Sequence, residues 1–398
     1  MTNRPNGWEE RRIDEWGGVR GGRQRSPRMS GTPRPYLRVA NVFDGRIEST
    51  DVLSMPFTDR EFATFRLEPG DILLNEGQSI DLVGRSAVYC GAPPDCAFQN
   101  TLIRFRPRSP SEASYFVAVF NRLWQSGRFA AIASRTTSIA HLGSGRFGGI
   151  RVVCPSLTVE REAIACRLQL FGERQEALTK VIRAKRQLKR GLAEQLLTGA
   201  LRFEGFKKRS RWLKQKLGDV FGERTESGRV DLPLLSITAG RGVVPRGELD
   251  RRDTSPPDKA AYLRIALGDI GYNTMRMWQG VSARSDLEGI VSPAYTVCVP
   301  GAGIDSRFAA HLFKLPALVA VFRRHSQGLV NDTLSLKFHH FAQIHVNIPD
   351  NDEQAAITSV LDALEREVSL LERLQDAYES ERRAVADLLL TGGVRVPA

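Results

Sequence analysis

Two long stretches of the chain place apolar side chains at the three- and four-residue spacing that forms one face of a helix. The first covers residues 158–198 and the second covers residues 352–390, and neither contains a proline. Each ends at an LLTG sequence, at residues 196–199 and 389–392. The glycine of this sequence is typical of the position just past a helix C-terminus. The pattern therefore predicts two helices of about 40 residues each.

The apolar residues of both stretches follow the 3.5-residue repeat of a coiled-coil seam. The predicted seam of the first helix consists of Ile164, Leu168, Phe171, Leu178, Ile182, Leu192 and Leu196. That of the second helix consists of Ile357, Leu361, Leu364, Val368, Leu371, Tyr378, Val385 and Leu389, in phase with the first at an offset of 193. Polar residues interrupt the seam at positions suited to fixing the register, namely Gln175, Lys185, Lys189, Gln375 and Arg382.

Charge distinguishes the two predicted helices. Residues 158–198 contain nine Lys or Arg and five acidic residues, whereas residues 352–390 contain four Arg and ten acidic residues. Opposite net charges favour pairing of the two helices with each other over pairing of each with a copy of itself. Each charge set could also be a solvated helix face. We expect the helices to pack within one chain as an antiparallel coiled coil.

The rest of the chain repeats together with the helices. Glu160 matches Glu353 at the offset of 193, and GDILLNE at residues 70–76 matches GDIGYNT at residues 268–274. Trp8 and the residues after it have a counterpart that begins at Trp212. The order is therefore a globular segment and a helix, written twice.

The globular segments consist of short β-rich runs between Gly, Pro and Asp residues, followed by helical patches. The β-rich runs include PYLRVANVFDGRIES, GDILLNEG, GRSAVYCG and NTLIRFRPR. The helical patches include ASYFVAVFNRLWQSG and ALVAVFRRHSQG. Each globular segment is therefore expected to be α+β.

The chain carries a formal net charge of +12 at pH 7, which favours a polyanionic partner. Nucleic acid is the first candidate, and an anionic membrane surface is the second. The sequence has no run of about 18 apolar residues and begins with a polar segment, so we expect a cytoplasmic protein.

Neither the cysteines nor the histidines form a pattern typical of a metal site. Five cysteines lack the paired short spacing of a zinc site, and we expect buried, reduced thiols. His339, His340 and His345 lie in an apolar run, KFHHFAQIHVNIP, that resembles a strand, so packed histidines are favoured over a metal site.

Motifs of catalysis and cofactor binding are missing from the sequence. Neither Pro-Pro pair has the acidic or amide residue before it, or the aromatic residue after it, that an amino-methyltransferase requires. Gly143, Gly145 and Gly148 match G-x-G-x-x-G, but a strand-like segment follows where a dinucleotide site needs a helix, so we interpret them as a loop. No P-loop or H-E-x-x-H motif occurs.

Several stretches make the chain resemble the specificity (S) subunits of type I DNA restriction-modification enzymes. PYLRVANVFDGRIES, LEPGDILLNEG, VGRSAVY and FQNTLIRFRP resemble successive parts of a target recognition domain. LKRGLAEQLLTGALRF and RRAVADLLLTGGVRV resemble the ends of the two conserved helices of that family, and the likeness is weakest over residues 221–330. The domains that the resemblance implies are recognition domains at 1–155 and 209–348 and helical regions at 156–208 and 349–398.

The resemblance implies a non-catalytic subunit that reads a bipartite sequence in double-stranded DNA, with the helices as a spacer. A 40-residue helix spans roughly 60 Å. Two methyltransferase (M) subunits would dock on the helices, and motor-nuclease (R) subunits would join for cleavage. The partners would hold S-adenosylmethionine, ATP and Mg, and this chain would hold no cofactor.

Candidate DNA contacts lie in segments with Gly or Ser that can approach a groove. They are Arg85, Arg135, Thr136, Thr137, Arg146, Arg276, Arg284, Arg307 and Lys337. Each alone could be a solvated surface residue, but as a set several are expected to contact phosphate. Two other hypotheses are a self-sufficient methyltransferase or nuclease, which the missing motifs oppose, and a structural coiled-coil adaptor, which the large β-rich segments oppose.

Overall fold

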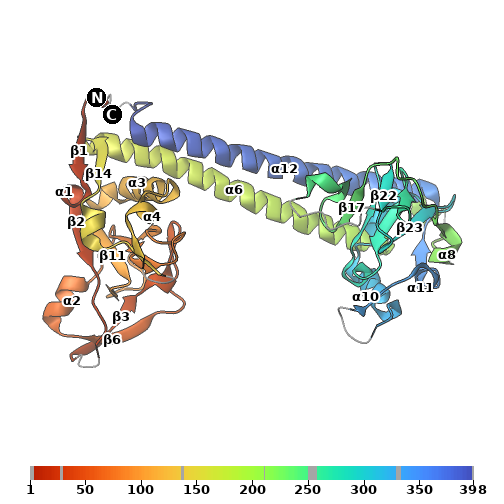
Figure 1. Cartoon of the computed structure of the whole chain (residues 1–398), viewed down its shortest axis with the longest axis horizontal. Helices are drawn as coiled ribbons and strands as arrows, with labels where there is room; N and C mark the ends of the chain where they lie inside the picture. Colours follow the sequence, from red (N-terminus) through yellow and green to blue (C-terminus); the bar gives the residue numbers. More distant parts are fainter. Residues whose placement is uncertain are drawn as a thin grey trace. The chain divides into compact units, whose positions relative to one another are not determined.

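The structure, a computed structural model, describes residues 4–26, 30–135, 139–209, 211–249, 258–328 and 333–396. The chain forms two compact units (Figure 1). Unit 1 comprises the described residues up to Thr179 together with those from Leu374 onward, and unit 2 comprises the described residues from Lys180 to Arg373. Strands and helices mix in both units, so the predicted α+β class is confirmed.

The two predicted long helices are present as α6 (Thr158–Leu197) and α12 (Asn351–Thr391), and each unit contains a part of both. In unit 1 the rings of Phe171 and Tyr378 lie 5.6 Å apart. Gln375 Nε2 donates a hydrogen bond of 2.7 Å to Thr179 Oγ1 in the same unit. Residue 171 of α6 thus faces residue 378 of α12, and residue 179 faces residue 375. The two helices therefore run in opposite directions where they touch.

The same direction holds in unit 2, where α6 and α12 are joined by ion pairs. Lys185 Nζ lies 2.7 Å from Glu367 Oε1, and Lys189 pairs with Glu365. Both lysines are among the polar residues of the predicted seam, and burial lowers the pKa of Lys189. Every apolar residue of the predicted seam is buried or half-buried. Lys185 and Lys189 thus meet acidic partners on the facing helix, whereas Arg382 pairs with Glu379 of its own helix.

Unit 1 is built from short strands and helices that precede α6 in sequence. Its strands are β1 Trp8–Arg12, β2 Gly17–Gly21, β3 Thr32–Leu37, β4 Val42–Phe43, β5 Arg46–Ile47, β6 Leu53–Phe57, β7 Ile72–Asn75, β8 Gly77–Gln78, β9 Ser86–Val88, β10 Ala97–Phe98, β11 Leu102–Pro107, β12 Ser134–Arg135, β13 Ala140–His141 and β14 Arg151–Pro155. Its helices besides α6 and α12 are α1 Ile13–Trp16, η1 Val39–Asn41, α2 Asp59–Phe65, η2 Pro110–Glu112, α3 Ala113–Gln125, α4 Arg128–Ile132 and α5 Ser144–Gly148.

Unit 2 has the same kinds of elements between the two long helices. Its strands are β15 Leu213–Lys216, β16 Phe221–Glu223, β17 Leu235–Thr238, β18 Gly242–Pro245, β19 Leu263–Ile265, β20 Ile270–Asn273, β21 Ser282–Arg284, β22 Gly289–Val291, β23 Tyr295–Pro300 and β24 His345–Ile348. Its helices are α7 Glu204–Lys207, α8 Leu217–Val220, η3 Arg246–Glu248, η4 Met277–Gln279, α9 Ser306–Leu312, α10 Pro316–His325 and α11 Phe338–Phe341.

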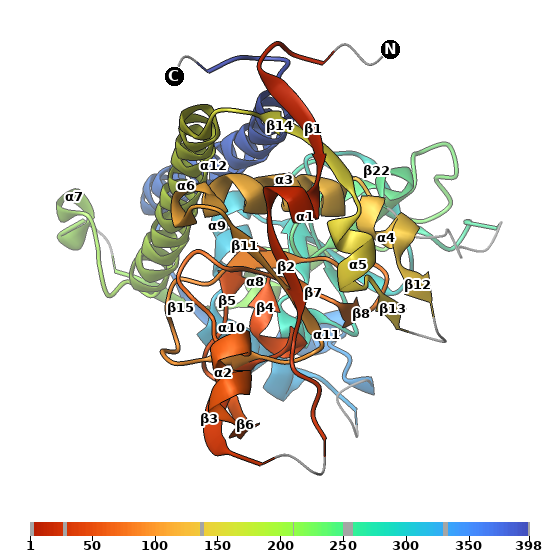
Figure 2. The ribbon, with the colours of Figure 1, turned by 90° about the vertical axis from the view of Figure 1, so that its left-hand side faces the viewer.

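One sheet and one ribbon of unit 1 recur in unit 2 with the same strand order, whereas the other sheets differ. Unit 1 contains an antiparallel sheet in the order β2-β11-β7-β9, and unit 2 contains one in the order β16-β23-β20-β21. A two-stranded ribbon joins the start of each globular part to the strand before each long helix, β1 with β14 and β15 with β24. Figure 2 shows β1, α1 and β2 following one another beside α3 in unit 1.

A buried glutamate at the start of each long helix binds an arginine and a tryptophan. In unit 1, Trp8 Nε1 donates to Glu160 Oε1 at 3.2 Å and Arg395 Nε donates to the same oxygen at 2.8 Å. In unit 2, the same bonds run from Trp212 Nε1 (3.2 Å) and Arg202 Nε (2.9 Å) to Glu353. We call these sets the Glu–Arg–Trp clusters of units 1 and 2.

The glycine of each LLTG sequence completes a Glu–Arg–Trp cluster. Gly392 and Gly199 have left-handed φ angles of 75° and 74°. A Cβ on Gly392 would lie 3.3 Å from Cε2 of Trp8, and one on Gly199 would lie 3.2 Å from Cε2 of Trp212. Each glycine thus ends its helix and makes room for the indole, which explains why the sequence repeats at these points.

Three local predictions from the sequence are wrong. The FHHF segment that resembles a strand forms helix α11, and the Gly143–Gly148 region contains the short helix α5. Cys96, Cys154 and Cys298 are buried free thiols as expected, but Cys90 and Cys166 are exposed. Among the described residues, no helix combines the length and the apolar character needed to cross a membrane.

Candidate nucleic-acid interface

One loop leaves the central sheet at the same place in each unit. The first loop, residues 76–83, connects β7 to β9 and includes β8, and the second loop, residues 274–279, connects β20 to β21. Asn75 N donates to Arg85 O at 3.0 Å beneath the first loop, and Asn273 N donates to Val281 O at 3.1 Å beneath the second. The two loops therefore have the same base but different lengths.

Both loops return to the sheet through a glycine in the left-handed region, Gly84 (φ 84°) and Gly280 (φ 75°). A Cβ on Gly84 would lie 2.2 Å from Phe129 of α4, and one on Gly280 would lie 3.1 Å from Val319 of α10. Close packing and backbone conformation both require glycine at these points. The ends of the two loops are thus fixed by buried contacts, and Val83 and Met277 anchor them in the cores, while Asp81, Met275 and Arg276 are exposed.

Basic and aromatic side chains gather around the second loop in unit 2. The guanidinium carbon of Arg323 lies 5.6 Å from the centre of the Trp278 ring, which joins the end of α10 to η4. Leu336 N donates to Thr274 O at 2.9 Å, which places Lys337 beside the loop. We call the set Arg276, Trp278, Arg323, Arg324 and Lys337 the basic surface of unit 2.

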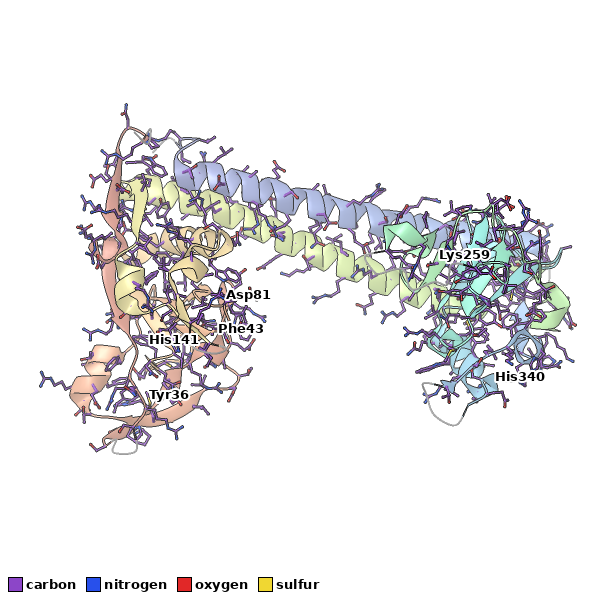
Figure 3. All side chains as sticks on the ribbon, in the orientation of Figure 1. Tyr36, Phe43, Asp81, His141, Lys259 and His340 are labelled. Atoms are coloured by element: carbon purple, nitrogen blue, oxygen red, sulfur yellow. The ribbon has the colours of Figure 1, made fainter. Side chains whose placement is uncertain are left out.

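The described segments that supply the basic surface of unit 2 contain no acidic residues, but Glu223 of the neighbouring strand β16 lies beside Lys337. These segments are residues 273–284, 316–328 and 333–345. His340, labelled in Figure 3, lies on α11 next to this surface. Its pKa is lowered by burial and by the neighbouring His339, His325 and Lys337. Glu223 of β16 interacts with His339, and burial raises the pKa of this carboxyl. Such a field suits a polyanion such as nucleic acid.

The corresponding region of unit 1 is mixed in charge. Phe147, Ile150 and Pro155 match Phe341, Ile344 and Pro349, so Arg146 stands where unit 2 has His340. Figure 3 labels His141 and Asp81 from this region. His141 Nδ1 lies 3.2 Å from Glu76 Oε2, and Asp81 is exposed in the first loop.

The candidate DNA contacts of unit 1 have different surroundings. Arg85 is half-buried: its Nη2 donates to Val42 O at 2.8 Å, and burial lowers the pKa of its guanidinium. Arg146 donates to Leu142 O, His141 O and Ser134 Oγ at 2.7–2.9 Å. Both arginines hold neighbouring backbone or side-chain groups in place. Arg135, in β12, is exposed. Thr136 and Thr137 lie outside the described residues.

The candidates of unit 2 divide in the same way. Arg276 and Lys337 are exposed members of the basic surface of unit 2. Arg284 donates to Ser306 Oγ at 2.9 Å and pairs with Asp286. Arg307 lies 3.9 Å from Asp305 and 3.7 Å from Asp362. The structure therefore brings two of the four together at one surface, and pairs the other two with acids.

The sequence reasoning missed Arg323, Arg324 and Trp278. Arg323 and Arg324 are exposed and belong to an RRH run at the C-terminus of α10. That run alone is a weak signal, because basic residues at a helix C-terminus are common. It indicates a charged patch only when it is considered together with the surrounding acid-free segments. Trp278 is half-buried, and its Nε1 donates to Met275 O at 3.0 Å.

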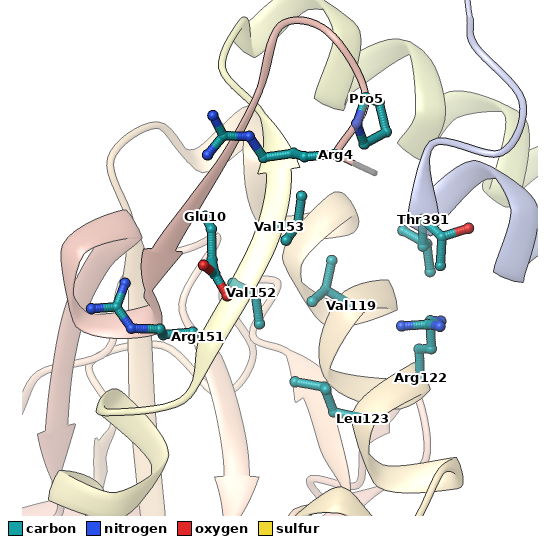
Figure 4. A pocket seen from close by; sticks show the side chains of 11 residues that line it. Arg4, Pro5, Glu10, Val119, Arg122, Leu123, Arg151, Val152, Val153 and Thr391 are labelled. Carbon is teal, nitrogen blue, oxygen red and sulfur yellow. The ribbon is translucent and has the colours of Figure 1, made fainter. Parts of the chain in front are cut away.

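Unit 1 also has a groove of about 550 Å³ beside the ribbon of β1 and β14 (Figure 4). Its lining combines Val119, Leu123 and Val152 with charged side chains. One of the charged groups, Arg122, donates to Asp387 Oδ1 at 2.6 Å. The charged and polar side chains of the lining include Arg4, Glu10, Arg151 and Thr391. In the described part of the chain, no three His, Cys, Asp or Glu residues are grouped to hold a metal ion.

No family model matches the sequence. The chain is 23% identical over 418 aligned residues to the MjaX type I restriction enzyme specificity subunit of Methanocaldococcus jannaschii, with 98% of this chain and 95% of the relative covered. Among solved structures, it is similar to the S subunit of a type I restriction-modification system from M. genitalium, with a TM-score of 0.54, 16% identity and 100% and 98% coverage.

Two further solved structures are similar over 98% of both chains. One comes from work on complex assembly and conformational transition of the type I restriction-modification system (TM-score 0.60, 17% identity). The other is the HsdS subunit from Thermoanaerobacter tengcongensis (TM-score 0.55, 14% identity). These proteins share the fold of this chain over nearly its full length. They confirm the resemblance to type I specificity subunits that the sequence indicated.

Proposed function

We propose that this chain, which resembles type I specificity subunits in sequence and shares their fold, selects the DNA sequence on which a type I restriction-modification complex acts. The observation that carries the proposal is the repeated strand frame with a loop in each unit that differs in length and sequence between the units. A protein that recognises one DNA sequence out of many requires a scaffold fixed by buried contacts, with exposed recognition residues that can differ between proteins.

The two globular parts, residues 1–155 and 209–348, would act as target recognition domains that each read one half of a bipartite target. The helical regions, residues 156–208 and 349–398, would pair as an antiparallel coiled coil and set the spacing. The contacts between α6 and α12 within each unit support this arrangement. The basic surface of unit 2 would supply phosphate contacts, including Arg276 and Lys337, and Arg135 would do so in unit 1.

The catalytic steps would belong to partner subunits. Two methyltransferase subunits would dock along the helices and bring S-adenosylmethionine, and motor-nuclease subunits would bring ATP and Mg. Cytoplasmic location follows from this assignment, because the DNA substrate and the partner subunits act there.

Co-expression with the methyltransferase subunit of the same source would test the proposal. The purified complex is incubated with S-adenosylmethionine and a random-sequence DNA library, and methylated adenines are mapped. We expect a bipartite motif. Replacing residues 1–155 with the recognition domain of another specificity subunit should change one half of the motif, and replacing residues 209–348 should change the other half.

Two controls make the outcome interpretable. The chain alone, incubated with labelled S-adenosylmethionine, should transfer no methyl group, whereas transfer would favour a self-sufficient methyltransferase. Failure of the chain to bind the methyltransferase subunit, or a motif that ignores both replacements, would overturn the proposal and favour an adaptor.

A further inference from the structure

We infer that the first loop (residues 76–83) and the second loop (residues 274–279) read base edges, each in one half of the target. This inference rests on the proposed function and adds the residues that determine specificity. It also separates them from the residues that hold the DNA backbone, which are Arg323, Arg324 and Lys337 in unit 2.

The first argument is the contrast between the loops and their bases. The hydrogen bonds from Asn75 and Asn273 correspond in the two units, and each loop ends at a glycine with a left-handed φ angle, Gly84 and Gly280. Between these fixed points the loops share neither length nor charge: EGQSIDLV contains two acids, whereas TMRMWQ contains one arginine and no acid. Loop residues that differ between the two units, above corresponding hydrogen bonds at the start and end of each loop, are placed to determine specificity.

The second argument is the chemistry of the second loop. Met275 is 49% exposed at a surface that is otherwise cationic, and the neighbouring Arg276 is exposed. An apolar side chain gains nothing from phosphate, but it can contact the methyl group of thymine, and an arginine can donate two hydrogen bonds to guanine. The flanking cations of α10 and Lys337 are suited to the phosphates on either side.

The third argument is the carboxylate of Asp81 in the first loop. It is exposed, and within the described part of the chain no hydrogen bond or ion pair engages it. A carboxylate at a DNA-facing surface is repelled by phosphate, so it costs affinity unless it accepts a hydrogen bond from an amino group. Cytosine N4 and adenine N6 present such amino groups in the major groove. Asp81 therefore selects a base with an exocyclic amino group.

The experiment maps methylation motifs for single variants of the full chain in complex with the methyltransferase subunit. Asp81→Asn should relax one position of the first half-site and leave the second half unchanged. Arg276→Ala should relax one position of the second half-site, with a loss of discrimination of about tenfold or more. Arg241→Ala is the matched control, because Arg241 is exposed in unit 2 and pairs with Glu248 away from the loop.

Arg323→Ala distinguishes base reading from phosphate binding. It should weaken binding to all sequences to the same extent and leave the motif unchanged. An unchanged motif in both Asp81→Asn and Arg276→Ala would overturn the inference. If the domain replacements still exchange half-sites in that case, the proposed function stands and only the placement of base reading in the loops is wrong.

A second variant guards against misfolding of the loops. Grafting residues 76–83 in place of residues 274–279 keeps the shared hydrogen bonds at the loop base. The graft should change the second half-site and keep the first. Complex formation with the methyltransferase subunit reports that the graft has folded, and an unaltered second half-site in a folded graft also counts against the inference.

Discussion

Units 1 and 2 have the same sheet order and the same Glu–Arg–Trp cluster, but they stabilise the next residue of each helix in different ways. Arg161, after Glu160, is buried and pairs with Glu112, and its Nη1 donates to Ser156 O at 3.1 Å. Gln354, after Glu353, is buried and donates to Pro349 O at 2.9 Å. The comparison teaches that the position needs a donor toward the preceding loop, and that a charge is optional.

The largest effect is expected from removing the glutamate of a Glu–Arg–Trp cluster. Glu353 is fully buried and its partner Arg202 is 17% exposed, so Glu353→Ala removes the carboxylate that accepts from both the Arg202 guanidinium and the Trp212 indole N–H. We expect a loss of about 3–5 kcal/mol in the stability of unit 2. Glu160→Ala should cost only about 1–2 kcal/mol, because Arg395 is 47% exposed and can be hydrated.

Calorimetry of the two variants, with hydrogen exchange at the starts of α6 and α12, would measure this difference. Equal losses in both units would contradict the argument from exposure.

A smaller effect should follow when the arginine of unit 1 is replaced with the amide of unit 2. Arg161→Gln removes the charge that faces Glu112, whose side chain is 2% exposed, and should cost about 3 kcal/mol. Adding Glu112→Gln should recover part of the loss because no buried charge then remains. Urea unfolding of the single and double variants measures the coupling, and an additive pair would show that the ion pair contributes nothing.

Next in size is the contribution of unit 2 to backbone binding. Arg323→Ala and Arg324→Ala should each lower the slope of log affinity against log salt by about 0.9 if each arginine neutralises one phosphate. Fluorescence anisotropy of a labelled duplex over a salt series gives the slope. Arg241→Ala serves again as the control, and equal slopes in all three variants would count against the basic surface of unit 2.

The smallest effect concerns pH, because His340 stands where unit 1 has Arg146. The pKa of His340 is lowered from its ordinary value of 6.5, so the folded protein binds this proton less readily than the unfolded chain. Stability should therefore fall as the pH drops below 6.5, since unfolding takes up a proton. DNA favours the charged imidazole, so affinity should rise in the same range.

Anisotropy titrations at neutral pH and at about pH 5.5 would measure the gain in affinity. His340→Gln should reduce this gain, whereas His340→Arg should give high affinity at both pH values, because the guanidinium stays charged over this range. A pH response that is unchanged in His340→Gln would assign the effect to other groups.

Periodicity and glycine placement were sufficient to predict α6, α12 and several strands of unit 1, such as β7, β9 and β11, because they depend on local spacing. The errors arose where local spacing is ambiguous. The short apolar run at residues 338–341 is compatible with a strand or a buried helix turn, and tertiary packing makes it helix α11. The bonds of Arg85 to Val42 and of Arg146 to Ser134 also escaped prediction, because their partners are set by the fold.

The candidate site was predictable as a basic surface but not as particular residues. Arg276 and Lys337 could be proposed from their Gly- and Ser-containing surroundings. Arg323 and Arg324 join them only because α10 packs on η4, which no pattern in either segment announces. The acid-free composition of the three segments is visible in the sequence, but its meaning depends on their meeting in space.

The Glu–Arg–Trp cluster of unit 1 has a consequence for synthesis on the ribosome. Unit 2 is continuous in sequence, whereas unit 1 takes Arg395 and the last part of α12 from residues that are translated after all of unit 2. During synthesis, Glu160 and Trp8 of unit 1 therefore lack their partner Arg395 until the end of the chain described here is translated. Unit 2 can complete its own Glu–Arg–Trp cluster as soon as Glu353 and the following helix emerge. Closure of unit 1 is the last step of folding, and it reports that the whole described chain has been made.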